Sequence, residues 1–324
     1  MRSFISNSDL AGLLKSVVVA AGLIGLAWIF VPAHVPYDEY PVFGAETLNG
    51  LILEQYLHEY DQKPIVLLGS SIQTGIPPFN CRPDNVATLY LQGRSAMTGL
   101  EAIRLIGAHP KVLFIEVSTL TIGTDFELTN TVFVPLYWQL RSLVPPLRHD
   151  RNWVVLMYRS KVYERSPPRF NLEEPTASIV EWKESMAPRT PPLDDRPIDD
   201  ATEADLKARI ANNIIADLKV RIHALQQQGT RVIFQDPVDP ALRIRPPLRE
   251  LRAALRSAFP DVEFIDAPDD LFPIYRWDRM HFQDASGLHY FNYLMKRAGL
   301  QNHPKCTLVV NPTNAASVEA RSAR

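Results

Sequence analysis

The residues of this 324-residue chain with the clearest potential for chemistry are a serine and a distant acid–histidine pair. Ser71 ends a Gly-Ser-Ser sequence after an apolar run, where the start of a helix would offer N–H groups. Asp278 and His281 are three residues apart, so one turn can bring the carboxylate to one imidazole nitrogen and leave the other as a general base. Together they form a candidate catalytic triad, with helix capping as the alternative role for the serine.

Gly93 follows a second apolar run and is a candidate for binding an oxyanion. A glycine lets the backbone approach a substrate closely and present its N–H group, although an ordinary turn would also account for it. Arg94, the next residue, is a candidate substrate-binding residue. The other histidines do not combine a nearby acid with a strand-end position, and we expect them to be solvated or structural: His34, His58, His109, His149, His223, His289 and His303.

A repeating pattern of short apolar runs and amphipathic stretches positions these candidates. Such runs are typical of strands buried in a parallel sheet, and we expect five, at residues 65–68, 86–91, 112–117, 231–235 and 262–265. Helical spacing of apolar residues predicts helices at 97–107, 206–225, 247–258 and 284–298. This order predicts an α/β fold, a flavodoxin-like five-stranded parallel sheet flanked by helices, whose ligands bind beyond the carboxyl ends of the strands.

The serine after the first expected strand, the glycine after the second and the Asp-x-x-His sequence after the last resemble the SGNH/GDSL hydrolase superfamily. The blocks of that family occur in this order on a sheet of this kind. The resemblance implies that Ser71 is the nucleophile, that His281 is its base and that Asp278 orients the histidine. It also implies an oxyanion hole that contains the N–H groups of Ser71 and Gly93.

The resemblance covers about residues 65–120 and 230–298, and two positions depart from the family pattern. Ser70 stands where the family has an acid, because the usual Gly-Asp-Ser is Gly-Ser-Ser here. The family also has an asparagine after the third strand as a further oxyanion donor. This chain has Glu-Val-Ser-Thr at residues 116–119, so Ser118 is the candidate donor in its place.

Residues 16–33 contain no charged side chain. As a helix, this run would span roughly 27 Å, just under the thickness of a bilayer core. Arg2 and Lys15 precede the run, and the positive-inside tendency places that end in the cytosol. We therefore expect a single-pass anchor in the inner or cytoplasmic membrane, with the main domain in the periplasm or outside. A cleaved signal peptide and a buried core helix are the alternatives.

Composition divides the chain into segments of different character. We expect a cytosolic tip and anchor at 1–33, a stalk or entry segment at 34–60, the SGNH-like domain at 61–300 with an insertion at about 125–200, and a loose tail at 301–324. Seven prolines fall between residues 163 and 200, so no regular element is expected there. That stretch could serve as a lid over the site.

The Gly-Ser-Ser form and the expected anchor are similar to two envelope branches of the superfamily. One is the extracytoplasmic serine protein of teichoic-acid D-alanylation, and the other acts in O-acetylation of exported polysaccharides. The resemblance implies a membrane-anchored serine esterase or acyltransferase acting on acyl esters of an exported or cell-envelope glycan, beside a multi-span membrane acyltransferase. The alternative is a catalytically silent accessory domain of the same fold that binds a glycan or a membrane partner.

Composition also limits the other classes of function. The 34 Lys and Arg residues nearly balance the 36 Asp and Glu residues, which argues against nucleic acid as a partner. There is no His/Cys/Asp cluster at metal-ligand spacing and no glycine-rich phosphate loop, so we expect no metal and no cofactor. Cys81 and Cys306 either pair in an oxidising compartment or remain free thiols.

Overall fold

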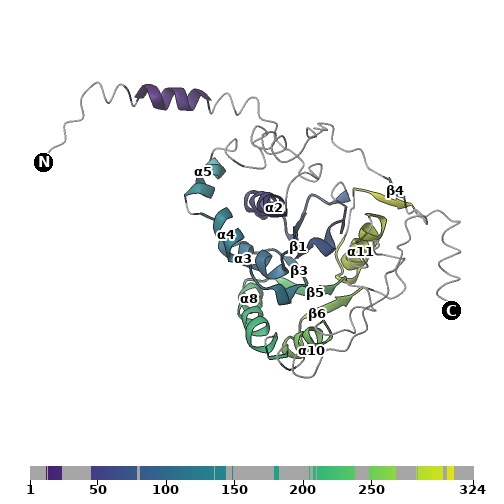
Figure 1. Cartoon of the computed structure of the whole chain (residues 1–324). Coiled ribbons are helices and arrows are strands. Elements are labelled where there is room, and N and C mark those ends of the chain that lie inside the picture. Colours follow the sequence, from purple (N-terminus) through teal and green to yellow (C-terminus); the bar gives the residue numbers. More distant parts are fainter. Residues whose placement is uncertain are drawn as a thin grey trace.

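Figure 1 shows the computed structural model of the chain. The structure describes residues 12, 14–23, 45–78, 81–134, 136–143, 148, 179–181, 204, 207–208, 210–237, 248–267, 282, 284–301 and 305–309. Of the candidate triad, Ser71 is among these residues, whereas Asp278 and His281 lie outside them.

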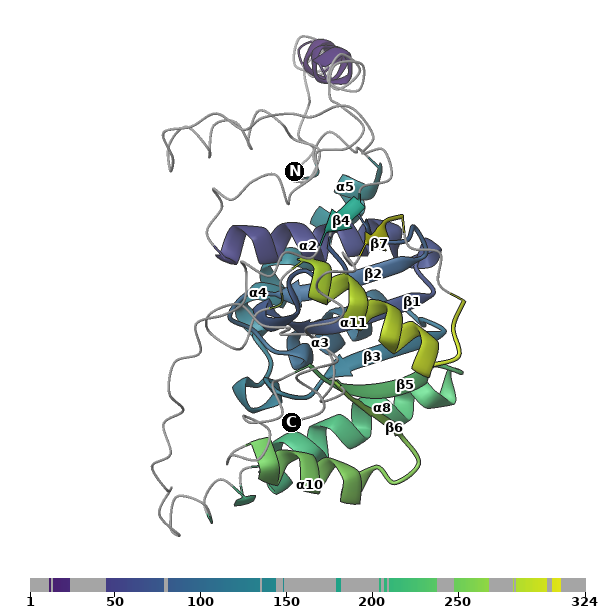
Figure 2. The ribbon, with the colours of Figure 1, turned by 90° about the vertical axis from the view of Figure 1, so that its right-hand side faces the viewer.

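Five parallel strands form the central sheet, in the spatial order β2-β1-β3-β5-β6 (Figure 2). Their bounds are β1 Ile65–Ser70, β2 Val86–Leu91, β3 Val112–Glu116, β5 Arg231–Asp236 and β6 Glu263–Asp266. Counted within this sheet, the order is 2-1-3-4-5, which is the flavodoxin-like arrangement. The prediction of an α/β fold with a five-stranded parallel sheet is therefore confirmed.

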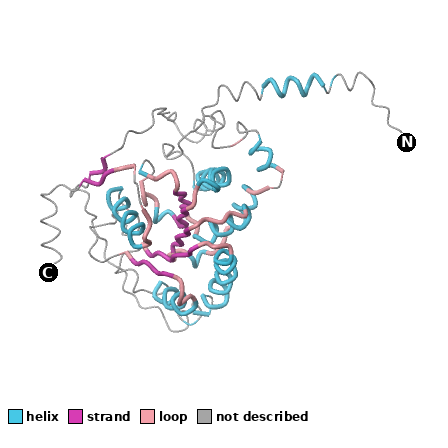
Figure 3. The backbone as a smooth tube through the Cα atoms, turned by 180° about the vertical axis from the view of Figure 1, so that it is seen from behind, coloured by secondary structure: helices cyan, strands magenta, loops and turns pink. Residues whose placement is uncertain are grey.

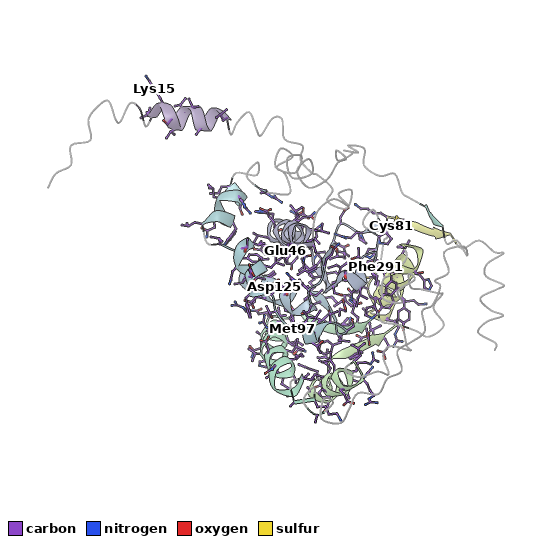
Figure 4. All side chains as sticks on the ribbon, in the orientation of Figure 1. Lys15, Glu46, Cys81, Met97, Asp125 and Phe291 are labelled. Atoms are coloured by element: carbon purple, nitrogen blue, oxygen red, sulfur yellow. A yellow bond between two sulfur atoms is a disulfide. The ribbon has the colours of Figure 1, made fainter. Side chains whose placement is uncertain are left out.

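Helices cover both faces of the sheet, as the view from behind in Figure 3 also shows. The helices are α2 Ala45–Glu59, α3 Ala96–Ile106, α4 Phe126–Val132, α5 Tyr137–Leu143, α8 Ala216–Gln227, α10 Leu248–Ala258 and α11 Asp284–Arg297. Leu68 of β1 packs with Met97 in the cluster under α2, α3, α8 and α10, whereas Leu67 packs with Phe291 under α11. Met97 and Phe291 mark these two sides in Figure 4. Burial on both faces explains why the strands are apolar throughout.

The expected helix at 206–225 differs from a regular α-helix in its first part. Residues Ile210–Ile215 form a π-helical turn, labelled η8, which continues into α8. In a π-helix the backbone hydrogen bonds join residues that are five positions apart, instead of four as in an α-helix. Accordingly Ile210 and Ile215 are both buried, whereas Ile214, four residues after Ile210, is only partly buried. The row of buried apolar side chains along this helix therefore shifts by one residue here.

Helix α2 lies within residues 34–60, the segment expected to lead into the domain. Its Leu53 and Tyr56 are buried in the cluster that also contains β1 and β2 residues. Glu54 of α2 forms a 2.8 Å ion pair with Arg141 of α5, and both side chains are buried. The structure thus fastens α5, which belongs to the expected insertion, to the domain through α2.

A second, two-stranded sheet joins the insertion to the chain's last described residues. Strand β4, Ile179–Glu181, pairs in parallel with β7, Thr307–Val309. The expectations of no regular element within 163–200 and of a loose tail from 301 differ from the structure at these residues. A disulfide between Cys81 and Cys306 holds the chain next to β7 against the domain, beside α11 (Figure 4). The disulfide constrains the unfolded chain and so favours the folded arrangement of this segment.

Residues 14–23, within and just before the expected anchor, are helical and expose apolar side chains such as Val18 and Leu23. Residues 24–33 of the expected anchor lie outside the described residues. Within the part of the chain that the structure describes, no helix has the length and apolar character needed to cross a membrane.

Candidate functional site

Ser71 lies directly beyond the carboxyl end of β1. The strand extends to Ser70, two residues further than expected, and Ser71 begins the short 3-10 helix η3, Ser71–Gln73. Ser70 caps this helix, since its Oγ accepts a hydrogen bond from the Ile72 N–H at 3.2 Å. Ser71 itself is partly buried. The buried apolar strand thus ends at Ser70, which caps η3, and the next residue, Ser71, lies at the edge of the sheet.

The position of β1 in the sheet makes the edge formed by the carboxyl ends of the strands a candidate ligand site. β1 lies between β2 and β3, so the chain leaves β1 on one side and returns on the other. In open α/β sheets the ligand crevice lies beyond the strands at such a reversal. The structure therefore places Ser71 at the topological switch point.

Gly93 lies beyond the neighbouring strand end. In the sheet register Ser70 is opposite Leu91, so Ser71 and Gly93 follow paired residues on strands that run about 4.8 Å apart. Gly93 has φ +66°, and the Arg94 N–H bonds to the Leu91 carbonyl oxygen at 3.0 Å across the turn. A left-handed φ of this kind favours glycine, which accounts for the residue type. The structure brings Ser71 and Gly93 to the same edge, as the sequence predicts.

The turn that contains Gly93 is fixed from helix α2. The Asn49 side chain donates to the Gln92 carbonyl oxygen at 2.9 Å and accepts from the Gln92 N–H at 2.7 Å. Asn49 is buried, and nothing in the sequence pattern had singled it out. Both backbone groups of Gln92 are thus held, which keeps the next peptide group in one orientation.

Arg94, the candidate substrate-binding residue, forms an ion pair with Asp125. Asp125 also caps α4, because its Oδ1 accepts from the Leu128 N–H at 2.9 Å. The guanidinium therefore already has a carboxylate partner, and it ties the loop after β2 to the start of α4. An anionic substrate group would have to compete with Asp125 for this cation.

The loop after Ser71 is held from both sides. The phenol of Tyr90 on β2 donates to the Ile76 carbonyl oxygen, and burial raises the pKa of this phenol, which keeps its proton in place. On the other side, α11 approaches so closely that a Cβ on Gly287 would overlap the carbonyl group of Gly75. The first turn of α11 therefore packs directly on the loop that follows η3.

Asp278 and His281 lie outside the described residues, so the triad geometry stays a prediction. The next residue, Phe282, is described and is fully buried, with its ring stacked 5.3 Å from that of Tyr290. Phe282 thus joins the core under α11 immediately after His281, and α11 itself packs against the loop that begins at Ser71.

A buried carboxyl group at this edge, that of Glu116 at the end of β3, accepts several hydrogen bonds. It is fully buried, and it accepts hydrogen bonds from the Ser70 N–H at 2.7 Å and from the Ser70 Oγ at 3.1 Å. The Ser118 Oγ and, at 3.3 Å, the Thr119 Oγ1 also donate to it. Burial raises the pKa of the Glu116 carboxyl above its ordinary value, and the hydrogen bonds from Ser118 and Ser70 offset only part of this rise.

These contacts give Ser118 a role other than the predicted one. A serine hydroxyl has one hydrogen, and that of Ser118 is donated to Glu116 rather than toward an oxyanion. The backbone N–H groups of Ser71 and Gly93 are therefore the oxyanion donors that the sequence prediction leaves at this edge.

Sequence reasoning missed Glu116 and the buried amide Gln73 of η3. The Gln235 side chain donates to the Gln73 Oε1 at 3.2 Å, and a Cβ on Gly69 would lie 2.5 Å from the Glu116 carboxylate. The sequence does show one acid, Glu116, at the end of the apolar run of β3, and this could have marked it as a candidate site residue. No pattern in the sequence connects it to Ser70, because the contact spans two strands.

Among the described residues, no three His, Cys, Asp or Glu side chains gather as the ligands of a metal ion would. Comparison of the chain with protein-family models, with curated protein sequences and with solved structures finds no match.

Proposed function

We propose that this protein is a membrane-anchored serine esterase or acyltransferase of the SGNH type, acting on acyl esters of an exported or cell-envelope glycan. The observation that carries the proposal is the position of Ser71. It is the first residue after the strand next to the topological switch point, on a turn held by a buried carboxylate, and Gly93 lies beyond the adjacent strand end. The ordered motifs supply the base and its orienting acid, His281 and Asp278.

In the proposed reaction His281 removes the Ser71 proton as the serine oxygen attacks the acyl carbon. The oxyanion that forms accepts hydrogen bonds from the N–H groups of Ser71 and Gly93. The bond to the sugar oxygen then breaks, and that oxygen takes the proton from His281, which leaves the acyl group on Ser71. Water or a second sugar hydroxyl, deprotonated by His281, then attacks the acyl carbon, the bond to the Ser71 oxygen breaks, and that oxygen takes the proton back from His281.

The location of the domain outside the cytoplasm is part of the proposal. The uncharged run at 16–33 supports an anchor, and its described part is a helix that exposes apolar side chains. The Cys81–Cys306 disulfide supports an oxidising compartment, because such bonds are rare in the cytosol. At that location a multi-span membrane acyltransferase is the proposed partner that delivers acyl groups.

A second candidate function is a catalytically silent domain that binds a glycan or a membrane partner. The bond from Ser118 to Glu116 favours it, because it leaves the oxyanion hole without this side-chain donor. Losing one such donor costs about 100- to 1,000-fold in reaction rate. A protein that only binds a partner does not depend on that rate.

A serine-directed fluorophosphonate distinguishes the two functions. The full chain, purified in detergent, is incubated with the probe, and the labelled peptide is mapped by mass spectrometry. The proposal predicts a label on Ser71 that is absent from the Ser71→Ala variant. The matched control is Ser95→Ala, which removes the serine cap of α3 and should keep the label. A folded wild-type protein without label at Ser71 would support the silent domain and refute the enzyme.

A further inference from the structure

Glu116 differs from the other acids at the carboxyl ends of the strands. Asp236 of β5 and Asp266 of β6 both pair with Arg252 of α10, the latter at 2.7 Å. Among the described residues, no Lys or Arg forms an ion pair with Glu116, although this side chain is fully buried. Removing a carboxylate from water without a cation is unfavourable, whereas burying a well-packed apolar side chain at the same position is favourable. Stability alone therefore does not account for an acid at this position.

The hydrogen bonds of Glu116 lead directly to the turn that presents Ser71. Both the N–H and the Oγ of Ser70 donate to the carboxylate. The same Oγ accepts from the Ile72 N–H, so its donor and acceptor capacity are both used. Ser71 lies between the two residues whose backbone this chain of hydrogen bonds fixes.

The carboxyl group of Glu116 fits this arrangement of donors. Two hydroxyls from the loop after β3 and two groups of Ser70 converge on its two oxygens. Its two oxygens accept these hydrogen bonds, whereas an amide would turn an NH2 group toward one of the donors. Gly69 leaves the space, because a Cβ there would lie 2.5 Å from Oε2 and would displace the carboxylate.

We propose that Glu116 is a positioning residue that acts through Ser70, holding the strand-to-helix turn so that the Ser71 hydroxyl faces its base. This inference rests on the proposed function, because Ser71 needs to be positioned only if it is the nucleophile. Glu116 is not a catalytic residue in this account, since it bonds to the cap of η3 and to the loop after β3 rather than to the reacting atoms.

The test compares Glu116→Gln with Glu54→Gln in the full chain. Both variants replace a buried glutamate, but Glu54 pairs with Arg141 between α2 and α5. Three quantities are measured: the thermal unfolding temperature, the rate constant of fluorophosphonate labelling against pH, and amide hydrogen exchange in the peptide containing residues 70–73.

We expect Glu116→Gln to lower the labelling rate constant by about 10- to 100-fold, the effect of a small misplacement of a reacting group. The pH dependence of labelling should keep its shape, because His281 remains the base. Exchange at residues 70–73 should become faster. Glu54→Gln should lower the unfolding temperature and leave both labelling and exchange at 70–73 unchanged.

Several results would overturn the proposal. Labelling by folded Glu116→Gln at the wild-type rate would show that Ser71 needs no such support. An altered pH profile would show that Glu116 acts on the proton itself. An equal loss of labelling in Glu54→Gln would assign the effect to general destabilisation. If the wild-type protein does not label at all, the proposed function fails, and unchanged exchange at 70–73 in Glu116→Gln would then separately refute the positioning role.

Discussion

Replacing Gly287 by alanine tests whether α11 packs on the loop that begins at Ser71. A Cβ at this position would overlap the carbonyl oxygen of Gly75, and the carbonyl carbon would lie 2.6 Å away. The overlapping atoms belong to the backbone, so no side-chain rotation relieves the contact. The helix or the loop must move, and the expected result is a less stable protein with a displaced Ser71 loop.

The magnitude follows from two opposing effects. Alanine inside a helix is favoured over glycine by about 1 kcal/mol, whereas inserting an atom into a packed contact costs about 1–3 kcal/mol. We take the upper end of the cost because the contact is with backbone, which gives a net destabilisation of about 2 kcal/mol for Gly287→Ala. Gly50 is the matched control, since it lies inside α2 with nothing near its Cβ position. Gly50→Ala should be stabilised by about 1 kcal/mol.

Thermal unfolding of the two variants, together with fluorophosphonate labelling, is the assay. The predicted difference of about 3 kcal/mol corresponds to about 6–12 °C in unfolding temperature for a domain of this size. Gly287→Ala should also label more slowly at Ser71 below its unfolding temperature, whereas Gly50→Ala should label normally. If Gly287→Ala gains stability as Gly50→Ala does, α11 does not lie against Gly75 and the reasoning is refuted.

Three further predictions concern the domain that carries the site. Cys306→Ser should destabilise the unreduced protein by about 5 kcal/mol in the chain-entropy model, measured by denaturant unfolding, because Cys81 and Cys306 close a loop of 225 residues; equal stability of the two proteins would argue against the disulfide. Arg141→Met should cost about 3–5 kcal/mol by leaving Glu54 buried without its cation, and Glu54→Gln added to it should restore part of the loss. The hydrogen bond from Arg104 lowers the pKa of Glu101. The ionised Glu101 therefore stabilises the fold fully above the ordinary glutamate pKa, and this stabilisation is lost as pH falls through the lowered pKa. In Glu101→Gln the free energy of unfolding should change less with pH on the acid side.

The strands of the sheet could be predicted from the sequence because each one is marked by its own run of neighbouring residues. Each strand is buried on both faces, so it appears as an uninterrupted apolar run such as 65–68 or 112–117. The side chains at the strand ends then follow from the rule that ligands bind beyond carboxyl ends. Ser71 and Gly93 were chosen as candidates in this way, and the register places them just beyond the ends of two adjacent strands.

The features that escaped prediction depend on contacts between distant segments. The link from Glu116 to Ser70 joins two strands, and the strand pair formed by β4 and β7 joins residues more than a hundred positions apart. From the sequence, Gly287 is only a residue that lowers helix stability. The reason for a glycine there is its close contact with Gly75, which the folded structure alone shows. The π-helical turn shifts the apolar stripe by one residue, which a pattern of regular spacing does not include.

In the proposed mechanism Ser71 and His281 act as one catalytic unit, and a double-mutant cycle on acyl-ester hydrolysis measures how strongly they depend on each other. Residues that act together lose nearly all their contribution when either is removed. We expect Ser71→Ala and His281→Ala each to lower kcat by a similar large factor, and the double variant to be no slower than either. Losses that multiply, or a folded single variant that retains full activity, would show that the two residues do not act as one unit.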